Sequence, residues 1–542
     1  MAKTAVRTPG RALAGALLGA SLLAAATPVT EGGAPAPASA TVEVLVRELT
    51  PAASAAEDAV RGVGGVITAT LPIVGGFAAE VPADRVDDLQ GADGVASVEP
   101  SAPVTFDGAY GQGSGGPSAV YPTVVRADRA WEAGYRGQGV GVAVIDTGVN
   151  PVGDLAGRVS HSADFTAEGD GVDRFGHGTF VAGMIAGTGA TDAGVTGTAP
   201  AAHIVSLKIA GADGSADITH VLAALQYAVS FKDALDIDVI NLSLGTDSTQ
   251  DYRLGLLNFA VERAWANGIV VVVSASNRGP DAQTISKPAD DPFVITVGAA
   301  DDRTTPGLGD DSVPAFSGTG PTAANGLAKP DLVAPGKSVV STRAPGSTVD
   351  VDNPGARIGD HHFVGSGTSF ASGVVSGAAA LVLSRNADLT PDQVKARLLD
   401  TARTGPVTDP HRAGAGWLDA EAATLSDSTR AANEGLRWSE GTGSVQASRG
   451  SLEINIQTGT AIDPVLGPLP VLTLLTGDLT AQNELFDDEA YREGEWSGSS
   501  WYGSSWYGSS WYGSSWYGSS WYGSSWYGSS WYGSSWYGDG WQ

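Results

Sequence analysis

The stretch GVGVAVIDTGV, from Gly139 to Val149, combines a near-continuous apolar run with an Asp-Thr-Gly turn. Three runs of the same kind follow it: IVSLKIA, DVINLSLG and GIVVVVSASN. Segments with helical spacing lie between them, such as HVLAALQYAVSF and RLGLLNFAVERAWANG. Strands that are apolar on both sides are typical of parallel sheets covered by helices, so the alternation predicts an α/β fold with helices on both faces. In such sheets the functional side chains gather at the carboxyl ends of the strands.

Three segments offer the groups that activate a hydroxyl for nucleophilic attack. Asp146 ends the first strand, His177 lies between two glycines in DRFGHGTFVAG, and Ser369 stands at the expected start of a helix in GSGTSFASG. An imidazole takes the hydroxyl proton, a carboxylate orients the imidazole, and a helix N-terminus supplies N–H donors. Asn277 ends GIVVVVSASN, where its amide can stabilise a developing oxyanion. Each residue alone has an ordinary explanation as a cap or loop residue, but the chain order Asp, His, Ser is a known order of a catalytic triad.

The blocks IDTGV, HGTFVAG, GTSFASG and SASN resemble the four signature blocks of the subtilisin-like serine protease family, over residues 121–423. The resemblance implies a serine-type endopeptidase that forms an acyl-enzyme. Ser369 is then the nucleophile, His177 the general base and acid, and Asp146 the residue that orients the histidine. Asn277 takes the role of oxyanion donor.

The same resemblance implies a substrate cleft bounded by two edge segments, GADGSA and SLG, which hold an extended peptide through its backbone. The residues assigned to substrate binding are Gly214, Ser215, Ala216, Ser243, Leu244, Gly245, Ser276 and Ser286. Ser286 is expected near the base of the main side-chain pocket. Because no acidic residue is placed there, we expect an apolar or medium-sized substrate side chain.

No cofactor is expected for catalysis. The family often binds structural calcium, and Asp154 aligns with one usual ligand, although the loop TGATDAGVTGTAP is shorter than the usual calcium loop. His361 and His362 are adjacent without a third metal ligand, which predicts a solvated loop. Phe180 stands where the family often has a second histidine, outside the triad.

The N-terminal residues have the order of a secretory signal peptide. Lys3, Arg7 and Arg11 precede an apolar run from Leu13 to Ala26, which is short for a membrane span. We expect a signal peptide at residues 1–26, with cleavage as late as residue 40. The protein is then secreted and extracellular, with cell-wall association as a variant, and an uncleaved N-terminal anchor is the alternative.

Residues 41–106 alternate strand-like and helix-like segments, which predicts a small α+β unit. This unit is similar to the inhibitor-type propeptide of the family, which implies an intramolecular inhibitor removed by self-cleavage between Phe106 and Ser118. Residues 107–120 are expected to form a linker, and residues 121–425 the catalytic domain.

The C-terminal part changes in texture. Residues 426–495 carry no functional pattern, whereas in residues 496–542 the pentapeptide WYGSS recurs with a period of five. Gly-Ser spacers favour a flexible tail, and paired aromatic rings can stack on sugars. Contact with the cell wall or with carbohydrate is one hypothesis, and removal of the tail during maturation is the other.

Composition limits the partners. The chain has 31 basic and 59 acidic residues, a net charge of −28, which disfavours nucleic acid, and it has no cysteine, which excludes disulfides and a thiolate nucleophile. We expect a monomer that acts on protein and peptide substrates. The alternatives are an adhesion protein built on an inactive protease fold, and an esterase whose G-x-S-x-G elbow is broken here by Ala371 and whose base is His411.

Overall fold

The computed structural model describes residues 41–50, 54–100, 103–106, 109–110, 119–191, 195–443, 461–463 and 467–469. These residues belong to one compact unit, residues 40–542. The predicted signal peptide, most of the predicted linker and the WYGSS tail lie outside the described residues.

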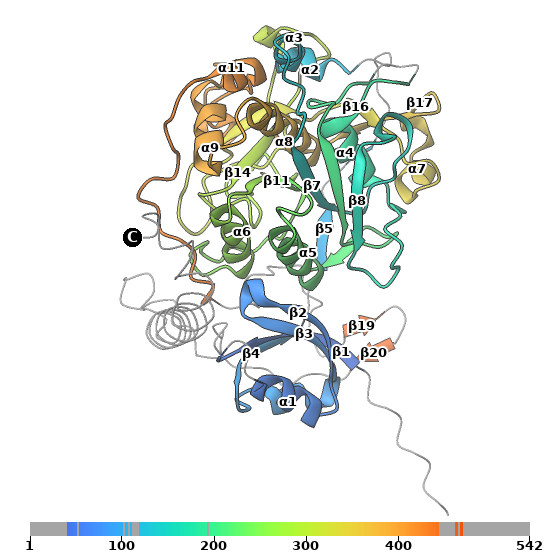
Figure 1. Ribbon diagram of the computed structural model, residues 1–542, viewed down its shortest axis with the longest axis vertical. Coiled ribbons are helices and arrows are strands. Elements are labelled where there is room, and N and C mark those ends of the chain that lie inside the picture. Colours follow the sequence, from blue (N-terminus) through green and yellow to red (C-terminus); the bar gives the residue numbers. More distant parts are fainter. Residues whose placement is uncertain are drawn as a thin grey trace, which may run out of the picture. The chain divides into compact units, whose positions relative to one another are not determined.

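The N-terminal domain is a four-stranded antiparallel sheet with one helix (Figure 1). Its strands, in spatial order, are β2 (Val66–Leu71), β3 (Gly76–Pro82), β1 (Thr41–Glu48) and β4 (Val95–Pro100). The helix α1 (Ala55–Gly62) packs against the sheet. Val44 and Val46 of β1 point into the domain's own core with Val60 of α1 and Phe77 of β3. The predicted small α+β unit is therefore confirmed.

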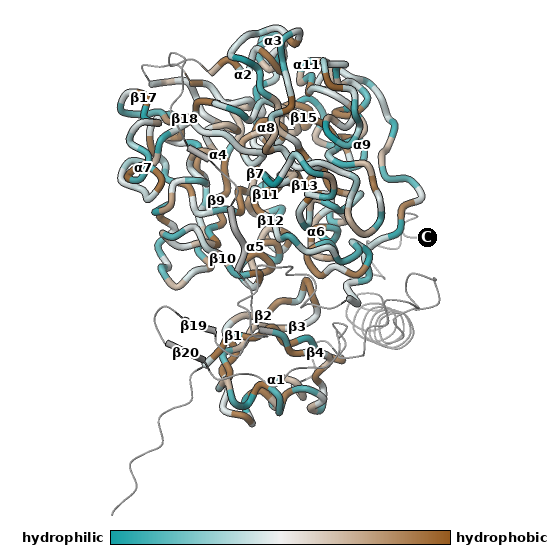
Figure 2. Tube along the Cα trace, turned by 180° about the vertical axis from the view of Figure 1, so that it is seen from behind, coloured by the Kyte–Doolittle hydropathy of each residue, from teal (hydrophilic) through white to brown (hydrophobic). Residues whose placement is uncertain are grey.

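The domain predicted to be catalytic is built on a seven-stranded sheet in which every pairing is parallel. The order is β15 (Leu332–Pro335), β14 (Ile295–Ala300), β13 (Val270–Ser274), β11 (Ile237–Leu242), β7 (Gly141–Asp146), β9 (His203–Lys208) and β8 (Val159–Asp164). Figure 2 shows apolar stretches along these central strands and polar stretches at the periphery. The four apolar runs of the sequence supply β7, β9, β11 and β13, as predicted.

Helices flank this sheet (Figure 1). α4 (His177–Ala186) and α8 (Thr368–Arg385) pack against each other and against the sheet, while α5 (Ile218–Ser230) and α6 (Leu256–Ala266) form a second pair. A Cβ added at Gly373 of α8 would lie 3.2 Å from the Cβ of Met184, so the glycine lets α4 and α8 approach closely. The remaining helices are α2 (Tyr121–Val124), α3 (Ala127–Glu132), α7 (Thr348–Asp352), α9 (Pro391–Asp400), α10 (Pro410–Ala413) and α11 (Ala420–Leu425).

Two small sheets involve the chain that connects the domains. β5 (Pro103–Phe106) pairs between β10 (Ser215–Asp217) and β12 (Leu244–Gly245). β6 (Ala109–Tyr110) pairs with β18 (His362–Ser366), which also pairs with β16 (Val339–Thr342) and β17 (Arg357–Ile358). A separate hairpin joins β19 (Ala461–Asp463) and β20 (Gly467–Leu469).

The described chain continues past Leu425 along the catalytic domain. Trp438 stacks on Phe293 with ring centroids 4.0 Å apart, and the Ser439 N–H donates to the buried carboxylate of Glu262 at 2.5 Å. Residues 426–443 therefore pack as part of this domain.

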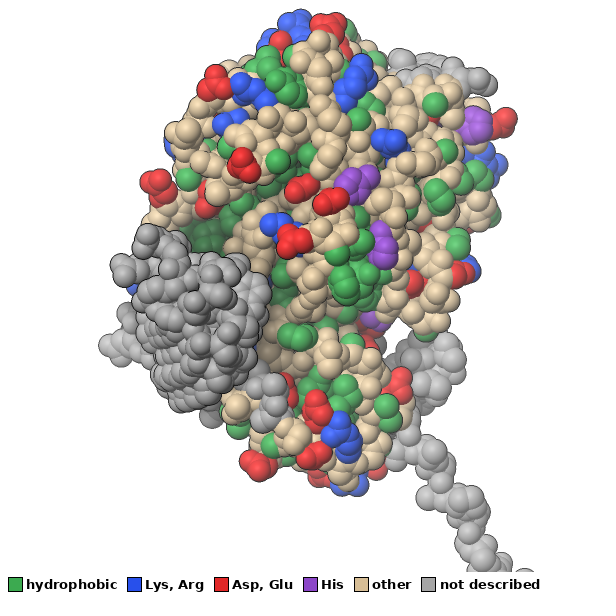
Figure 3. All heavy atoms as spheres, viewed as in Figure 1, with side chains coloured by type: hydrophobic (Ala, Val, Ile, Leu, Met, Phe, Trp, Pro, Cys, Tyr) green, Lys and Arg blue, Asp and Glu red, His purple; other side chains and the backbone are tan. Residues whose placement is uncertain are grey.

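Figure 3 shows acidic side chains spread over the visible face with basic ones between them. No helix in the described ranges is both long and apolar enough to cross a membrane.

Candidate active site

Asp146 and His177 form a fully buried hydrogen-bonded pair. Asp146 is the last residue of β7, and His177 is the first residue of α4. The Nδ1 atom of His177 lies 2.8 Å from Oδ1 and 3.0 Å from Oδ2 of Asp146. Because an ionised carboxylate only accepts hydrogen bonds, Nδ1 carries the proton and Nε2 keeps its lone pair. The ring is thus held in the tautomer that a general base requires.

Asp173 fixes the loop that leads into His177. It is buried, and its carboxylate accepts hydrogen bonds from the Thr147 hydroxyl at 2.8 Å, the Gly176 N–H at 2.7 Å, and the Thr179 N–H and hydroxyl at 2.9 and 2.5 Å. Burial raises the pKa of Asp173, and these hydrogen bonds offset only part of that effect. The sequence analysis missed this positioning role, although an acidic residue shortly before a helix start was a visible clue.

The glycines on both sides of His177 are required by close packing. Gly176 has a φ of +108°, and an added Cβ would lie 2.4 Å from the Ser347 hydroxyl oxygen. A Cβ at Gly178 would lie 2.2 Å from the carbonyl oxygen of Gly148. Glycine at both positions therefore allows neighbouring segments to approach His177 closely.

Ser369 lies in the first turn of α8, next to the His177 helix. It is buried, and its hydroxyl lies within hydrogen-bond distance of the Ser243 carbonyl oxygen, 3.2 Å away. The ring of the following residue, Phe370, has its centroid 5.5 Å from that of His177 and 4.3 Å from that of Phe180. Phe180, which stands where the family often has a histidine, therefore packs against Phe370, and Phe370 in turn lies against His177.

A buried polar network supports the first turn of α8. The Ser372 hydroxyl donates to the Ser369 carbonyl oxygen at 2.7 Å, and the Asn241 amide donates to the hydroxyls of Ser372 and Ser376 at 3.1 and 3.0 Å. The Ser243 hydroxyl donates to the Asn241 side-chain oxygen at 2.8 Å. The sequence did not reveal this network, because its members are far apart in the chain.

Asn277 is held with a defined amide orientation. Its Oδ1 accepts hydrogen bonds from the backbone N–H of Thr368 at 2.8 Å and from the Thr368 hydroxyl at 2.9 Å. Since both donors face the oxygen, the Nδ2 group points away from Thr368. Asn277 is half-buried, so this amide is accessible at the N-terminus of α8.

The predicted edge segments flank an extended strand of the same chain. Thr105 of β5 is opposite Ser215 on one side and opposite Gly245 on the other, with antiparallel register in both pairings. Val104 is opposite Ala216, and Phe106 is opposite Leu244. The two segments therefore have the spacing and direction that fit one extended peptide strand between them.

The remaining predicted cleft residues lie behind these segments. Ser286 is buried, and its hydroxyl oxygen would lie 2.4 Å from a Cβ at Gly245. Gly214 has a φ of +75°, and a Cβ there would meet the ring of Phe175. Ser276 has a φ of +98° directly before Asn277, and its hydroxyl donates to the carbonyl of Thr284. A non-glycine residue in this conformation is strained, which marks Ser276 as part of the site's framework.

The carboxylate of Asp154, the predicted calcium ligand, is bound by hydrogen-bond donors of the chain itself. The buried carboxylate accepts hydrogen bonds from the Thr191 N–H at 2.8 Å, the Thr191 hydroxyl at 2.9 Å and the Nε2 of His362 at 2.8 Å. Burial raises the pKa of Asp154, but the hydrogen bonds from His362 and Thr191 outweigh this and lower it. Calcium prefers six to eight oxygen ligands, and among the described residues no third acidic or histidine side chain joins this pair as a metal-binding group.

The expectation of a solvated loop is wrong for His362. Its side chain is 2 % exposed because β18 turns it inward onto Asp154, whereas the neighbouring His361 is exposed. Adjacent residues of a strand face opposite sides, so the two histidines have different environments.

Comparison with known proteins agrees with this geometry. The family model described as "Subtilase family" matches residues 137–417, and that described as "Putative peptidase inhibitor domain" matches residues 21–101. Serine protease AprX of Bacillus subtilis (strain 168) is 40% identical over 315 residues, covering 56% of this chain and 71% of that protein. Subtilisin DY of Bacillus licheniformis is 34% identical over 302 residues, and subtilisin BL of Lederbergia lenta 36% over 301, each match covering 55% of this chain and 96% of the relative.

These findings define a serine endopeptidase with an α/β catalytic domain and an inhibitor-like N-terminal domain. The chain belongs to the subtilase family.

Proposed function

We propose that this protein is a secreted endopeptidase that hydrolyses extended polypeptides through Ser369, His177 and Asp146, and that it is made as a precursor that processes itself. The observation that carries the proposal is the buried Asp146–His177 pair beside the helix that bears Ser369. In this mechanism Nε2 of His177 removes the proton from the Ser369 hydroxyl, whose oxygen attacks the substrate carbonyl. Asp146 stabilises the resulting imidazolium, which gives its proton to the leaving amine as the scissile C–N bond breaks and the acyl-enzyme forms. Water, activated by the same histidine, then hydrolyses the acyl-enzyme and frees Ser369.

We assign stabilisation of the oxyanion of the tetrahedral intermediate to the Asn277 side-chain amide and the backbone N–H of Ser369. Support comes from the fixed orientation of the Asn277 amide at the N-terminus of α8, where backbone donors and the helix dipole favour negative charge. Neither donor has to reorganise when the charge develops. That preorganisation is the source of the expected rate enhancement.

Substrates are proposed to bind as an added strand between residues 214–216 and 243–245, with Ser276 and Ser286 lining the main pocket. Support comes from β5, which pairs with both segments at once. Recognition through backbone hydrogen bonds is compatible with many sequences, so we expect broad specificity with a preference for apolar or medium-sized side chains. No cofactor takes part in these steps.

Self-processing is proposed to occur between Phe106 and Ser118. Support comes from the strand pairings of β5 and β6, which engage β12 on one side and β18 on the other. The N-terminal domain then acts as an intramolecular inhibitor.

Three further proposals rest on the sequence alone. The proposed export rests on the first 26 residues, and the proposed monomer rests on the composition. The proposed contact with the cell wall or carbohydrate rests on the WYGSS repeat.

The experiment that tests the proposal compares the purified protein with Ser369→Ala in casein cleavage and by N-terminal sequencing. We expect casein cleavage and loss of residues 41–106 only in the chain that keeps Ser369. An active chain that still begins at Thr41 would refute self-processing. If neither the parent nor Ser369→Ala cleaved casein, the result would support the alternative of an adhesion protein on an inactive fold.

A further inference from the structure

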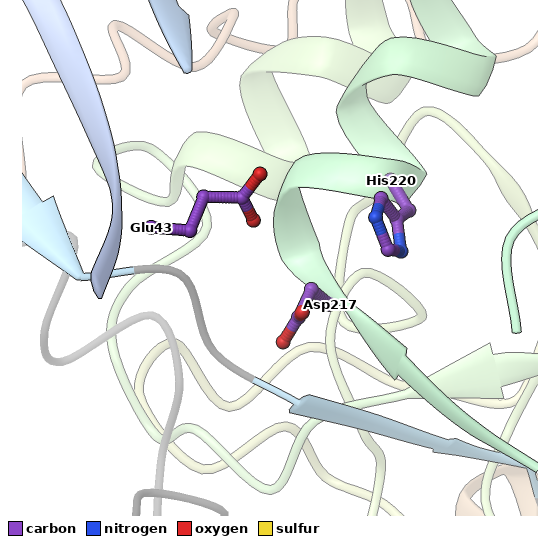
Figure 4. Close-up of side chains that lie close together, drawn as sticks. All are labelled: Glu43, Asp217 and His220. Atoms are coloured by element: carbon purple, nitrogen blue, oxygen red, sulfur yellow. The ribbon is translucent and has the colours of Figure 1, made fainter. Parts of the chain in front are cut away.

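A group of three metal-binding side chains lies outside the active site. Glu43 belongs to β1, Asp217 is the last residue of β10, and His220 lies in the first turn of α5. Their ligand atoms all lie within 4.8 Å of one another, and all three residues are half-buried. Figure 4 shows Glu43 extending toward the first turn of α5, with His220 on that turn and Asp217 just before it. Among the described residues this is the group with three potential ligands.

Packing fixes the direction of Glu43. Residues of β1 alternate between two faces, and Val44 and Val46 fill the core of the N-terminal domain. Leu45, two residues after Glu43, belongs instead to the same buried cluster as Ile218 and Val221 of α5. Glu43 therefore lies on the face of β1 that is directed to α5. Asp217 and His220 are three residues apart, a spacing that places side chains on one side of a helical turn.

The chemistry of His220 suits a metal ligand. Its Nδ1 lies 3.2 Å from the carbonyl oxygen of Ile209, and a carbonyl only accepts, so Nδ1 carries the proton. The Nε2 atom of the neutral ring then keeps the lone pair. Histidine ligands of metals are typically oriented in this way, by a hydrogen bond from the other ring nitrogen to a backbone carbonyl or a carboxylate.

A cation bound between two carboxylates this close would offset their mutual repulsion. Two carboxylates with one imidazole form a ligand set for a divalent transition metal such as zinc, whereas calcium prefers oxygen ligands alone. We propose that Glu43, Asp217 and His220 bind a divalent transition-metal ion that joins the N-terminal domain to the catalytic domain. Given the proposed self-processing, Glu43 precedes the cut and the other two ligands follow it. The ion then slows release of the inhibitor-like domain after the cut.

The test uses the full chain carrying Ser369→Ala, without a histidine tag, so that Glu43 stays attached. Zinc binding is measured by equilibrium dialysis and calorimetry at pH 7.5. We expect one site, with affinity lowered at least about tenfold by Glu43→Gln and by His220→Gln. The matched controls are Glu80→Gln, an exposed glutamate of β3, and His361→Gln, an exposed histidine, which should bind zinc like the parent.

Binding is measured in an uncleaved chain, so its result does not depend on whether self-processing occurs. An absence of zinc binding, or binding equal in Glu43→Gln and the parent, would overturn the proposal. The alternative is that a protonated His220, and not a metal ion, neutralises the two carboxylates. The parent chain would then bind no zinc, and this result would also overturn the proposal. In the chain that keeps Ser369, a chelator should speed release of the cut N-terminal domain, and Glu43→Gln should remove that effect.

Discussion

The side-chain oxygen of Asn277 accepts two hydrogen bonds from Thr368, from its backbone N–H at 2.8 Å and from its hydroxyl at 2.9 Å. This contact joins the loop after β13 to the first residue of α8. It directs the Asn277 Nδ2 group away from Thr368. The proposed oxyanion donor is thus oriented by the same helix that carries the proposed nucleophile.

Replacing Asn277 by Ala is expected to lower kcat about 10²- to 10³-fold with little change in KM, the loss known from subtilisin, a relative of this protein. The reason is that the amide contributes mainly when charge develops on the substrate carbonyl. Steady-state hydrolysis of a chromogenic peptide measures both constants. Thr368→Val, which leaves the backbone N–H donor in place, should lose only about fivefold. A kcat within about fivefold of the parent for Asn277→Ala would contradict this role.

Asp146→Asn is expected to reduce kcat about 10⁴-fold, because an amide donor facing Nδ1 favours the wrong histidine tautomer. Single-turnover kinetics with a good peptide substrate measure this loss. Asp170→Asn, which alters an exposed carboxylate paired with Arg174, should stay within about twofold of the parent. If the two variants are equally active, Asp146 does not orient the base.

The mature N-terminus is expected at residue 107, 108 or 109. Phe106 is the last residue of β5, opposite Leu244, and Ala109 is the first residue of β6, opposite Ser366. Ser369 follows Ser366 by three residues and contacts Ser243, so the strands that pair with β5 and β6 both lead to the proposed nucleophile. Intact-mass spectrometry of the purified, processed protein measures the position. A terminus before Pro103 or after Tyr110 would show that the pairings do not define the cut.

Asp350 should make stability depend on acid pH. Burial would raise the pKa of this carboxyl, but hydrogen bonds from Arg343, from the Gly346 N–H and from Arg357 outweigh burial and lower it to about 2. A group whose pKa falls on folding stabilises the protein above its unfolded pKa, and this contribution, roughly 2 kcal/mol, is lost as the pH falls through about 2.

Asp350→Asn in a Ser369→Ala background, which prevents self-digestion, should therefore lower the free energy of unfolding by roughly 2 kcal/mol at pH 7. The deficit should shrink below about pH 4. Urea unfolding at pH 7, 5 and 3 measures it, and a deficit that does not change with pH would argue against the assignment. Asp350 belongs to α7, and the Val349 N–H of this helix donates to the carbonyl oxygen of Phe175, two residues before His177. Activity should therefore fall as well.

Local patterns were enough to predict the sheet and the placement of Asp146 and His177. The run VGVAVID became β7 because its side chains are buried on both faces. The glycines beside His177 allow close packing, because a Cβ would meet the Ser347 side chain at Gly176 and the Gly148 backbone at Gly178. Long-range contacts were not predictable. Asp154 and His362 are 208 residues apart, and no local pattern indicates that they pair. Asp173 likewise depends on Thr147, which is 26 residues away.

The identity of the nucleophile is tested most directly by labelling the mature enzyme with a fluorophosphonate probe and mapping the modified residue by mass spectrometry. The proposed mechanism predicts one label per molecule on Ser369, with no label on Ser369→Ala and much slower labelling of His177→Ala. A label on a different serine, or casein cleavage by Ser369→Ala, would contradict it.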